Sequence, residues 1–479
     1  MGLLNLLRHY YMSLRHNNLS KERLLGIQEQ RFRDLLGHAA KHSEFYQDLY
    51  AGIDIEKCRL HDLPIVTKSA MMNNYDRFVT DKRLRLHEVQ SWLNKENNKD
   101  KFYLGKFIPV FTSGSTGENA LVIYERSALE QVQATTYSRL PNETTLSAYF
   151  QTKLLLTQIL DTKIRSAVLV VPDGNVHTLF KCMPSFSRLF MKRKLLSLFD
   201  PLEQIVKELN EFQPDQLIAY SSFIGRLAAE QLAGRLNISF DHPMSFLVGC
   251  SEPLTENVNK LAFKAWGRHI KDVYATAECC FMAGSCDAFG HMHGMNDLCI
   301  LEIVDHEYNS VPPGQFGEKV LLTNLFNFIQ PIIRYEIEDV SGYADKSCKC
   351  GLPFPTLLSV QGRTTDFFFF EKPRGGYEKF HPYLLRVPLF YVYDLRQYQI
   401  VQTARNELTF FYVTQTERLE IEQQLTQTLQ EAFGRAGLES RITLKLKRIE
   451  SINRNQKSGK FQIMQSLGPP SQLDTIQNH

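Results

Sequence analysis

Residues 112–117 read TSGSTG and place four hydroxyl side chains and two glycines in six consecutive positions. Glycines let backbone N–H groups turn inward and hydroxyls add further donors, so such a loop can surround a phosphate. The same residue types are also common in solvated surface turns. No lysine follows Gly117, as a Walker loop requires, and the next residues, NALVIYE, are typical of a strand. The segment is therefore a surface turn or an anion-binding loop between two strands, and a P-loop NTPase is disfavoured.

Four further patches carry charged side chains at places where strands or domains are expected to end. Glu278 follows DVYAT, Asp339 lies near the end of PIIRYEIEDV, Arg363 lies in GRTTD, and Lys460 lies in NRNQKSGKFQ. Each residue alone has an ordinary structural interpretation, as a helix-start carboxylate, a turn cap, a surface ion pair or a solvated lysine. Taken singly, these patches specify no function.

The elements that must position these residues alternate between strands and helices through the middle of the chain. Strands are expected over residues 166–172, 216–220, 245–250 and 272–276, and helices over 200–212 and 255–267. This alternation predicts an α/β fold with a largely parallel sheet. Ligands in such folds gather at the carboxyl ends of strands, where the hydroxyl loop and Glu278 both lie.

The pattern changes in the last third of the chain. Residues 298–343 read as strands without intervening helices, and the tail predicts a small β-β-α-β lobe. We therefore expect a large N-terminal α/β domain with a small β-rich part over residues 1–362. A joint at 363–366 then leads to a small α+β lobe over 367–479.

Composition restricts the class of protein. The 479 residues are 43% hydrophobic and 22% charged, which is typical of a globular chain with more than one domain. Lysine and arginine number 55 against 52 acidic residues, and this net charge of +3 gives no argument for a nucleic-acid or membrane partner. No apolar run approaches the ~20 residues of a membrane helix, and residues 1–16 read as an amphipathic helix packed on the body rather than a signal peptide. Nine cysteines without a secretory signal predict reduced thiols in the cytoplasm.

Together and in this order, the patches resemble the acyl-adenylate-forming superfamily, and within it the phenylacetate–CoA ligase-like and coenzyme F synthetase-like branch. The resemblance covers nearly the whole chain. It is also carried by LLGHAAKHSEFYQDLY and LPIVTKSAM near the N-terminus, and by GCSEPLT, CKCG and KFHPYLL further on. Ordered agreement of this many patches is more specific than any one motif.

The resemblance implies an ATP-dependent enzyme that activates a carboxylic acid as an acyl-AMP and passes the acyl group to a thiol. It implies that the hydroxyl loop holds the ATP phosphates, that Glu278 holds Mg²⁺ and that Asp339 accepts the ribose hydroxyls. Arg363 at the joint and Lys460 on the mobile C-terminal lobe complete the catalytic set. The residues implied in nucleotide binding are Thr112, Ser113, Gly114, Ser115, Thr116, Gly117, Ser251, Glu252, Tyr274, Ala275, Asp339 and Arg363.

We expect the acid to bind between the segments AYSSF and ECCFMA. Tyr220, Phe223, Cys279 and Phe281 would line this pocket. Their rings indicate an aromatic acid, although aromatic side chains are also common core residues. The expected acceptor is CoA or the phosphopantetheine of an acyl carrier protein, and the sequence leaves the oligomeric state open.

Cysteines and histidines in CDAFGHMH and CKCG offer the ligands of a structural zinc site, namely Cys286, His293, Cys348 and Cys350. A C-x-C pair is less specific than paired C-x-x-C, so spacing alone leaves small buried cysteines as an equal alternative. Relatives in this branch often carry matching cysteine and histidine positions. That resemblance favours zinc, and it favours His293 over His291 as the ligand.

Three departures from the family pattern leave other functions open. Glu118 follows the hydroxyl loop where proline and lysine are usual, Ala275 and Ala277 replace a glycine and a threonine, and Thr365 stands at the usual pivot position. One alternative is an adenylating enzyme that delivers its acyl group, or AMP, to an amine or a protein without a thioester. The other is a nucleotide-binding scaffold without turnover, which the retained acidic residues and lysine disfavour.

Overall fold

The computed structural model divides into two compact units. The first comprises Met1–Leu254, Val258–Ile337 and Ser341–Val360, and the second comprises Thr255–Asn257, Glu338–Val340 and Gln361–His479. The structure describes residues 3–95, 98, 101–111, 120–140, 163–170, 191–242, 245–285, 291–363, 367–380, 385, 389, 392, 395–414, 419–435, 437–438, 440–452 and 463–468.

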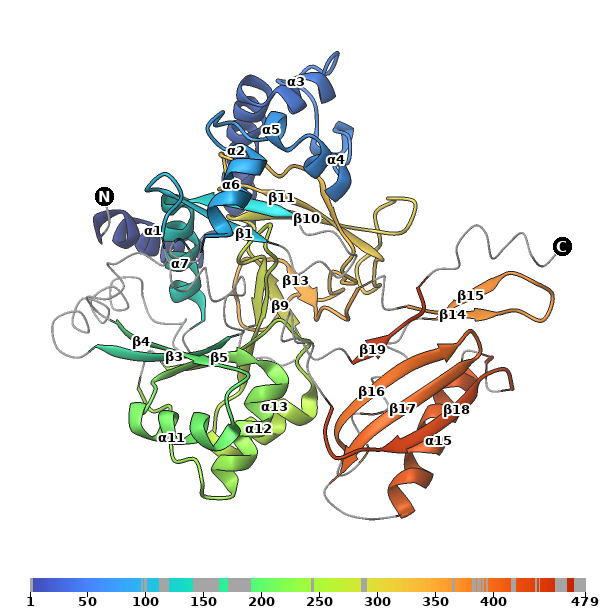
Figure 1. The fold of residues 1–479 in the computed structure, drawn as a ribbon. Coiled ribbons are helices and arrows are strands. Elements are labelled where there is room, and N and C mark those ends of the chain that lie inside the picture. Colours follow the sequence, from blue (N-terminus) through green and yellow to red (C-terminus); the bar gives the residue numbers. More distant parts are fainter. Residues whose placement is uncertain are drawn as a thin grey trace. The chain divides into compact units, whose positions relative to one another are not determined.

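An eight-stranded sheet forms the centre of the first unit (Figure 1), with strand order β13-β9-β8-β7-β6-β5-β3-β4. The pairings from β4 through β3, β5 and β6 to β7 are parallel, whereas those from β7 through β8 and β9 to β13 are antiparallel. This largely parallel sheet confirms the predicted α/β fold. The strands are β3 (Ile164–Val170), β4 (Met191–Ser197), β5 (Gln216–Tyr220), β6 (Phe246–Cys250), β7 (Ile270–Tyr274), β8 (Ala283–Ser285), β9 (His291–Gly294) and β13 (Thr356–Leu358).

The central strands are buried on both faces, which explains their nearly continuous apolar sequences. In β5, Leu217 and Ala219 join the apolar cluster that includes side chains of α11, α12 and α13, whereas Ile218 joins the cluster on the other side. Figure 1 shows these three helices together on one face of the sheet. Their bounds are α11 (Leu202–Phe212), α12 (Ser221–Leu232) and α13 (Glu256–Trp266).

Helices also make up most of the N-terminal part of this unit. The predicted amphipathic helix is present as α1, and its buried Leu6, Tyr10 and Leu14 belong to the same apolar cluster as Leu129 and Val132 of α7. The helices are α1 (Leu3–His16), α2 (Lys21–His42), α3 (Glu44–Leu49), α4 (Lys68–Asn73), α5 (Tyr75–Phe78), α6 (Leu86–Leu93) and α7 (Arg126–Arg139), with a 3₁₀ turn over Leu60–Asp62.

A buried ionic cluster fixes the end of α1 to the body. Asp297 Oδ2 lies 2.7 Å from His16 Nδ1, and both carboxylate oxygens accept hydrogen bonds from Arg139 at 2.7 and 2.8 Å. Burial opposes ionisation of Asp297, but Arg139 and His16 more than offset it and hold its pKa well below the usual range. The Arg139 guanidinium also lies over the Phe354 ring, 4.2 Å from the ring centre.

Two smaller sheets complete the first unit. The hairpin of β1 (Phe107–Phe111) and β2 (Leu121–Glu125) is antiparallel, with Phe111 opposite Leu121. The hydroxyl loop thus joins strand to strand, as predicted, although residues 112–119 lie outside the described residues. The second sheet, in order β10-β11-β12, comprises β10 (Cys299–Val304), β11 (Lys319–Asn324) and β12 (Tyr335–Ile337).

The second unit carries the predicted β-β-α-β pattern. Its four-stranded sheet has the order β18-β17-β16-β19. Phe410 in the sheet and Leu425 and Leu429 in α15 are fully buried members of one apolar cluster. The elements are β14 (Phe368–Glu371), β15 (Tyr377–Phe380), β16 (Leu395–Ala404), β17 (Glu407–Thr414), α15 (Leu419–Arg435), β18 (Thr443–Arg448) and β19 (Met464–Gln465). Across the described residues of both units, none of the helices combines the length and apolar character that crossing a bilayer requires.

Candidate active site and candidate metal centre

The strand that follows the hydroxyl loop is held by two buried amide side chains. Gln330 accepts a hydrogen bond from Ile123 N at 2.7 Å and donates to Leu121 O at 3.0 Å, and Asn327 donates to Ile123 O at 2.9 Å. These bonds satisfy the free edge of β2, where unpaired backbone groups would otherwise be buried. The predicted phosphate-binding residues Thr112–Gly117 themselves lie outside the described residues.

The segment predicted to face adenine follows β6 at its carboxyl end. Ser251 has a φ of 64°, in the left-handed region, so the chain turns sharply there. Glu252 is buried, and its Oε2 accepts hydrogen bonds from Ser222 N at 3.2 Å and Ser222 Oγ at 2.6 Å. A carboxylate at the first turn of α12 is stabilised by the helix dipole, so Glu252 fixes strand β6 to that helix. A Cβ at Gly249 would lie 2.5 Å from Ser221 Oγ, so any larger residue there would require that hydroxyl to move.

The carboxylate predicted to hold Mg²⁺ lies in a closed loop after β7. Thr276 N donates to Cys279 O at 3.0 Å, and Cys279 N donates to Thr276 O at 3.3 Å. Glu278 is 8% exposed, its Oε1 accepts a hydrogen bond from the Tyr335 hydroxyl at 3.2 Å, and its backbone oxygen accepts one from Asn324 at 2.8 Å. Carboxylate oxygens are the ligands that Mg²⁺ prefers, and this one is held in place by a neighbouring strand, so the residue fits the ion.

The side chains beside Glu278 are buried packing residues rather than reactive groups. The buried Tyr124 hydroxyl donates to Ala277 O at 2.6 Å. Burial raises the pKa of the Cys280 thiol to about 12 and raises that of Cys279 well above its usual value. Both cysteines are therefore protonated near neutral pH and are poor nucleophiles. Tyr274 and Ala275, predicted near adenine, begin this loop at the end of β7.

Asp339 and Arg363 meet in the second unit. They form an antiparallel β-bridge, flanked by hydrogen bonds from Val340 N to Gly362 O at 2.8 Å and from Gln361 N to Val340 O at 2.9 Å. Arg363 Nε donates to Asp339 Oδ1 at 3.3 Å. The predicted ribose-binding carboxylate and joint arginine are therefore neighbours. Lys460 and Thr365 lie outside the described residues.

The four side chains predicted to bind the acid lie in two different apolar clusters. Tyr220 and Phe223 pack with the helices on one side of the sheet. Cys279 and Phe281 pack in the cluster on the other side, where Phe281 fills the space above Gly284. The described contacts therefore do not gather the four side chains around one cavity.

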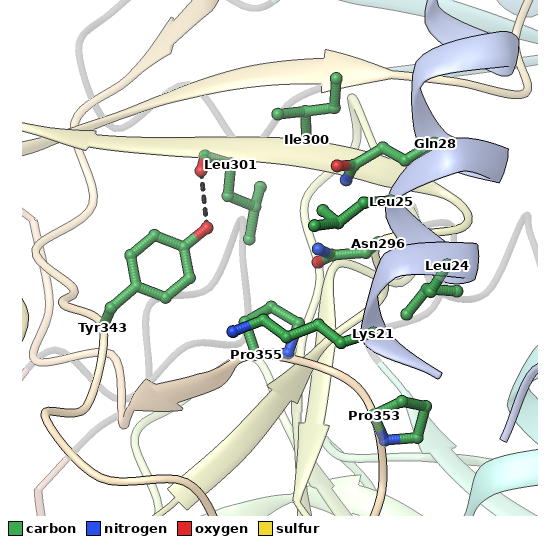
Figure 2. A pocket seen from close by; sticks show the side chains of 10 residues that line it. All are labelled: Lys21, Leu24, Leu25, Gln28, Asn296, Ile300, Leu301, Tyr343, Pro353 and Pro355. Carbon is green, nitrogen blue, oxygen red and sulfur yellow. Dashed lines mark hydrogen bonds between the residues drawn. The ribbon is translucent and has the colours of Figure 1, made fainter. Parts of the chain in front are cut away.

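A cavity of about 260 Å³ lies between α2 and the segments around β10 (Figure 2). Leu24, Leu25 and Gln28 of α2 line one side, and Tyr343, whose hydroxyl donates to Leu301 O at 2.7 Å, lines the other. None of the residues predicted to do chemistry lines it. Its volume is below the ~300–1,000 Å³ typical of ligand pockets, so we assign it no function.

The structure brings three of the four predicted zinc ligands together. One ligand atom each of His293, Cys348 and Cys350 lies within 4.8 Å of the others, and Cys350 Sγ lies 3.1 Å from His293 Nε2. The pairing of β9 with β13 places Thr356 opposite His293, and Thr356 Oγ1 accepts a hydrogen bond from Cys348 N at 3.1 Å. Cys286, the fourth predicted ligand, lies outside the described residues.

The chemistry of these donors fits a zinc ion. His293 Nδ1 lies 3.4 Å from Phe354 O, an arrangement that leaves Nε2 directed at Cys350 Sγ. Burial lowers the pKa of His293, so its ring is neutral near pH 7 and offers a lone pair. Two thiolates and an imidazole are the donors of structural zinc sites. The 3.1 Å between Cys350 Sγ and His293 Nε2 also lies within the ~4 Å that separates tetrahedral ligands of one ion.

Sequence reasoning did not single out the side chains that hold Glu278. Tyr335 lies inside PIIRYEIEDV, where only Asp339 was chosen, and Asn324 ends a strand that carried no motif. The signal that points to Asn324 is a polar residue at the end of a strand whose centre, residues 320–322, is apolar.

Solved structures similar to this chain span nearly its whole length. A crystal structure of 2-hydroxyisobutyryl-CoA ligase in the postadenylation state aligns with a TM-score of 0.64 and 18% identity, over 95% of this chain and 91% of that one. An open conformation of the same ligase, in complex with 2-HIB-AMP and CoA, aligns with a TM-score of 0.55 and 18% identity, over 94% of this chain and 92% of that one. The chain has the fold of the acyl-adenylate-forming enzymes.

Other similar proteins align over less of the chain or at lower identity. The amide bond synthetase McbA from Marinactinospora thermotolerans aligns with a TM-score of 0.51 and 12% identity, over 73% of this chain and 66% of that one. Protein CapK from Staphylococcus aureus is 22% identical over 276 residues, so the match spans 57% of this chain and about half, 54%, of that protein. No protein-family model matches the chain. The adenylate-forming fold therefore rests on structural likeness together with the order of the motifs.

Proposed function

We propose that this chain is an ATP-dependent ligase that activates a carboxylic acid as an acyl-AMP and transfers the acyl group to a thiol. The observation that carries the proposal is the likeness over 95% of the chain to a CoA ligase solved with an acyl adenylate. The placement of Glu278 after β7 and of Ser251 after β6 supports it, because ligands of open α/β sheets bind at the carboxyl ends of strands.

In this proposal the chain's own residues neutralise and orient two anions. Asp339 accepts the ribose hydroxyls and Arg363 stays beside it, so the two side chains together orient the nucleotide. Glu278, oriented by Tyr335, would hold Mg²⁺, which offsets the charge of the phosphates when it is bound. Lys460 contributes the positive charge that the attacking carboxylate requires. The acceptor thiol belongs to CoA or to the pantetheine of a carrier protein.

The zinc ion has a structural part in this proposal. His293, Cys348 and Cys350, with Cys286 as the predicted fourth ligand, would hold it and so fix the loop that contains CKCG to strand β9. Cys58, Cys279, Cys280 and Cys299 are free thiols, which agrees with a reducing compartment, and we propose the cytoplasm.

The test is ATP–pyrophosphate exchange with a panel of aromatic, aliphatic and hydroxylated carboxylic acids, followed by thiol trapping of the acid that works best. Acid-dependent exchange supports adenylation, and a thioester formed with CoA or pantetheine supports the second step. Asp339→Ala is the matched negative control. ATP binding without exchange for any acid would favour the scaffold, and would refute the ligase.

A second candidate is an adenylating enzyme with an amine acceptor. The likeness to an amide bond synthetase favours it, although over less of the chain. The same experiment separates the two, because an amide formed in the absence of any thiol, with no thioester in its presence, would select the amine acceptor.

A further inference from the structure

Helix α1 takes no part in the candidate active site, yet its orientation is fixed. Ser13 Oγ lies 2.9 Å from Thr135 Oγ1 of α7, and Asn17 just beyond the helix donates to Ser138 O at 3.4 Å. His16 at its end is bound to the buried Asp297. The helix cannot turn about its axis without breaking these bonds, so its outer face is a constant part of the surface.

The outer face carries large apolar side chains in contact with solvent. Leu4 is 83% exposed, Tyr11 is 44% exposed and Met12 is 41% exposed. Of the ten large apolar side chains exposed by 36% or more in the described part of the chain, three therefore lie on this 14-residue helix. A concentration of this kind marks an interaction site rather than the scattered apolar residues of an ordinary surface.

Two arginines lie on the same face. At about 100° per residue, positions 4, 8, 11, 12 and 15 all fall within one arc of about 100°, with Arg8 and Arg15 near its middle. Both arginines are exposed, and the Arg15 guanidinium lies 6.0 Å from the centre of the Tyr11 ring. Residues 1–21 contain no aspartate or glutamate. The face therefore attracts anions, although the net charge of the whole chain gave no such indication.

We propose that this face, defined as Leu4, Arg8, Tyr11, Met12 and Arg15, adsorbs the chain to the surface of an anionic lipid bilayer. Arginine forks bind lipid phosphates, and apolar side chains beside them enter the boundary between headgroups and acyl chains. A tyrosine ring is stable at the same depth. The helix lies in the plane of the surface, because 14 residues span only about 21 Å.

A protein partner fits this face less well. Arginine, tyrosine and methionine also occur at protein interfaces, so the argument for lipid rests on charge. Both charged side chains of the face are basic and residues 1–21 contain no acidic side chain. A continuous layer of lipid phosphates complements that single sign of charge without any matched set of partner carboxylates. The proposal is independent of the ligase activity and does not require it.

The test is co-sedimentation of the full chain with vesicles of phosphatidylcholine containing phosphatidylglycerol, and with vesicles of phosphatidylcholine alone, at physiological salt. We expect binding to the first and none to the second. Arg8→Ala combined with Arg15→Ala should weaken binding about 30-fold, from roughly 1 kcal/mol for each arginine near an anionic surface. Leu4→Ser combined with Met12→Ser should also weaken it, with the charge unchanged.

The matched control removes the same charge elsewhere. Lys372→Ala combined with Arg374→Ala, in the exposed turn between β14 and β15, should leave vesicle binding within twofold of the parent chain. Equal loss in this control would mean that the net charge matters rather than the α1 face, and would overturn the proposal. No binding to anionic vesicles would also overturn it. So would a lipid-free dimer in sedimentation velocity that Leu4→Ser dissociates, because the face would then belong to a second copy.

Discussion

Replacement of Tyr335 by phenylalanine tests whether Glu278 is held in place for a metal ion. The change removes one hydroxyl that lies 3.2 Å from Glu278 Oε1 and keeps the buried ring. A hydrogen bond to a charged group contributes ~1.5–3 kcal/mol, and loss of a group that orients a metal ligand weakens affinity ~10–100-fold. The bond is longer than the ~2.6 Å of a strong hydroxyl–carboxylate bond. We therefore take the lower end of both the energy range and the affinity range. We therefore expect about tenfold weaker apparent Mg²⁺ affinity and a free energy of unfolding lower by about 1.5 kcal/mol.

The assay is pyrophosphate exchange as a function of Mg²⁺ concentration at fixed ATP and acid, with urea unfolding measured in parallel. Tyr124→Phe is the control, because its hydroxyl donates to a neutral backbone oxygen, Ala277 O, in the same loop. This control should lose about 1 kcal/mol of stability and keep the Mg²⁺ dependence of the parent. If both variants shift the Mg²⁺ dependence equally, or if Tyr335→Phe leaves it unchanged, then Tyr335 supports the fold and does not position Glu278 for the ion.

Other predictions concern the metal, the ionic cluster and the two half-reactions. The purified chain should contain about one zinc ion; Cys348→Ser and Cys350→Ser should each abolish it and lower the melting temperature, which metal analysis and calorimetry would check. Asp297→Asn should cost ~3–5 kcal/mol in urea unfolding, because it leaves Arg139 buried and uncompensated. Since the pKa of Asp297 is depressed in the folded chain, its contribution to stability should be complete above pH ~4 and decline below it; an unfolding free energy from this residue that rises on acidification would contradict the assignment. Asp339→Ala should abolish exchange with the fold intact, and unchanged exchange would reject the ribose contact. Lys460→Ala should slow exchange by ~10² or more but convert synthetic acyl-AMP to thioester at near the parent rate; equal losses in both steps would contradict a role confined to the first.

The sequence was sufficient for features that depend on local patterns. Alternating apolar strands and amphipathic helices predicted the parallel sheet, and the β-branched residues after the hydroxyl loop predicted that β2 follows it. The strand-ending positions of Glu278 and Ser251 were predictable for the same reason. These features need only neighbours in the chain, so a single sequence contains them.

Features that depend on pairing between distant segments were beyond the sequence. Tyr335 reaches Glu278 only because β12 and the loop after β7 lie side by side, and 57 residues separate them in the chain. Phe223 packs in the apolar cluster on one side of the sheet and Phe281 in the cluster on the other side. The aromatic pattern of the sequence alone does not indicate this separation. The grouping of His293 with Cys348 and Cys350 also depends on the register of β9 with β13, and the sequence indicated it only through the family resemblance.

Phe354 contacts both the candidate zinc site and the ionic cluster at the end of α1. Its backbone oxygen faces Nδ1 of His293, and its ring covers the guanidinium of Arg139, which in turn binds Asp297. A loop loosened by loss of metal would carry this ring away and admit water to the ion pair that anchors the end of α1. If zinc binds as proposed, its occupancy and the docking of the N-terminal helix are thermodynamically linked. A chelator should accelerate amide hydrogen exchange in α1, far along the chain from any ligand it removes, and the energies of substitutions at Cys350 and Arg139 should not be additive.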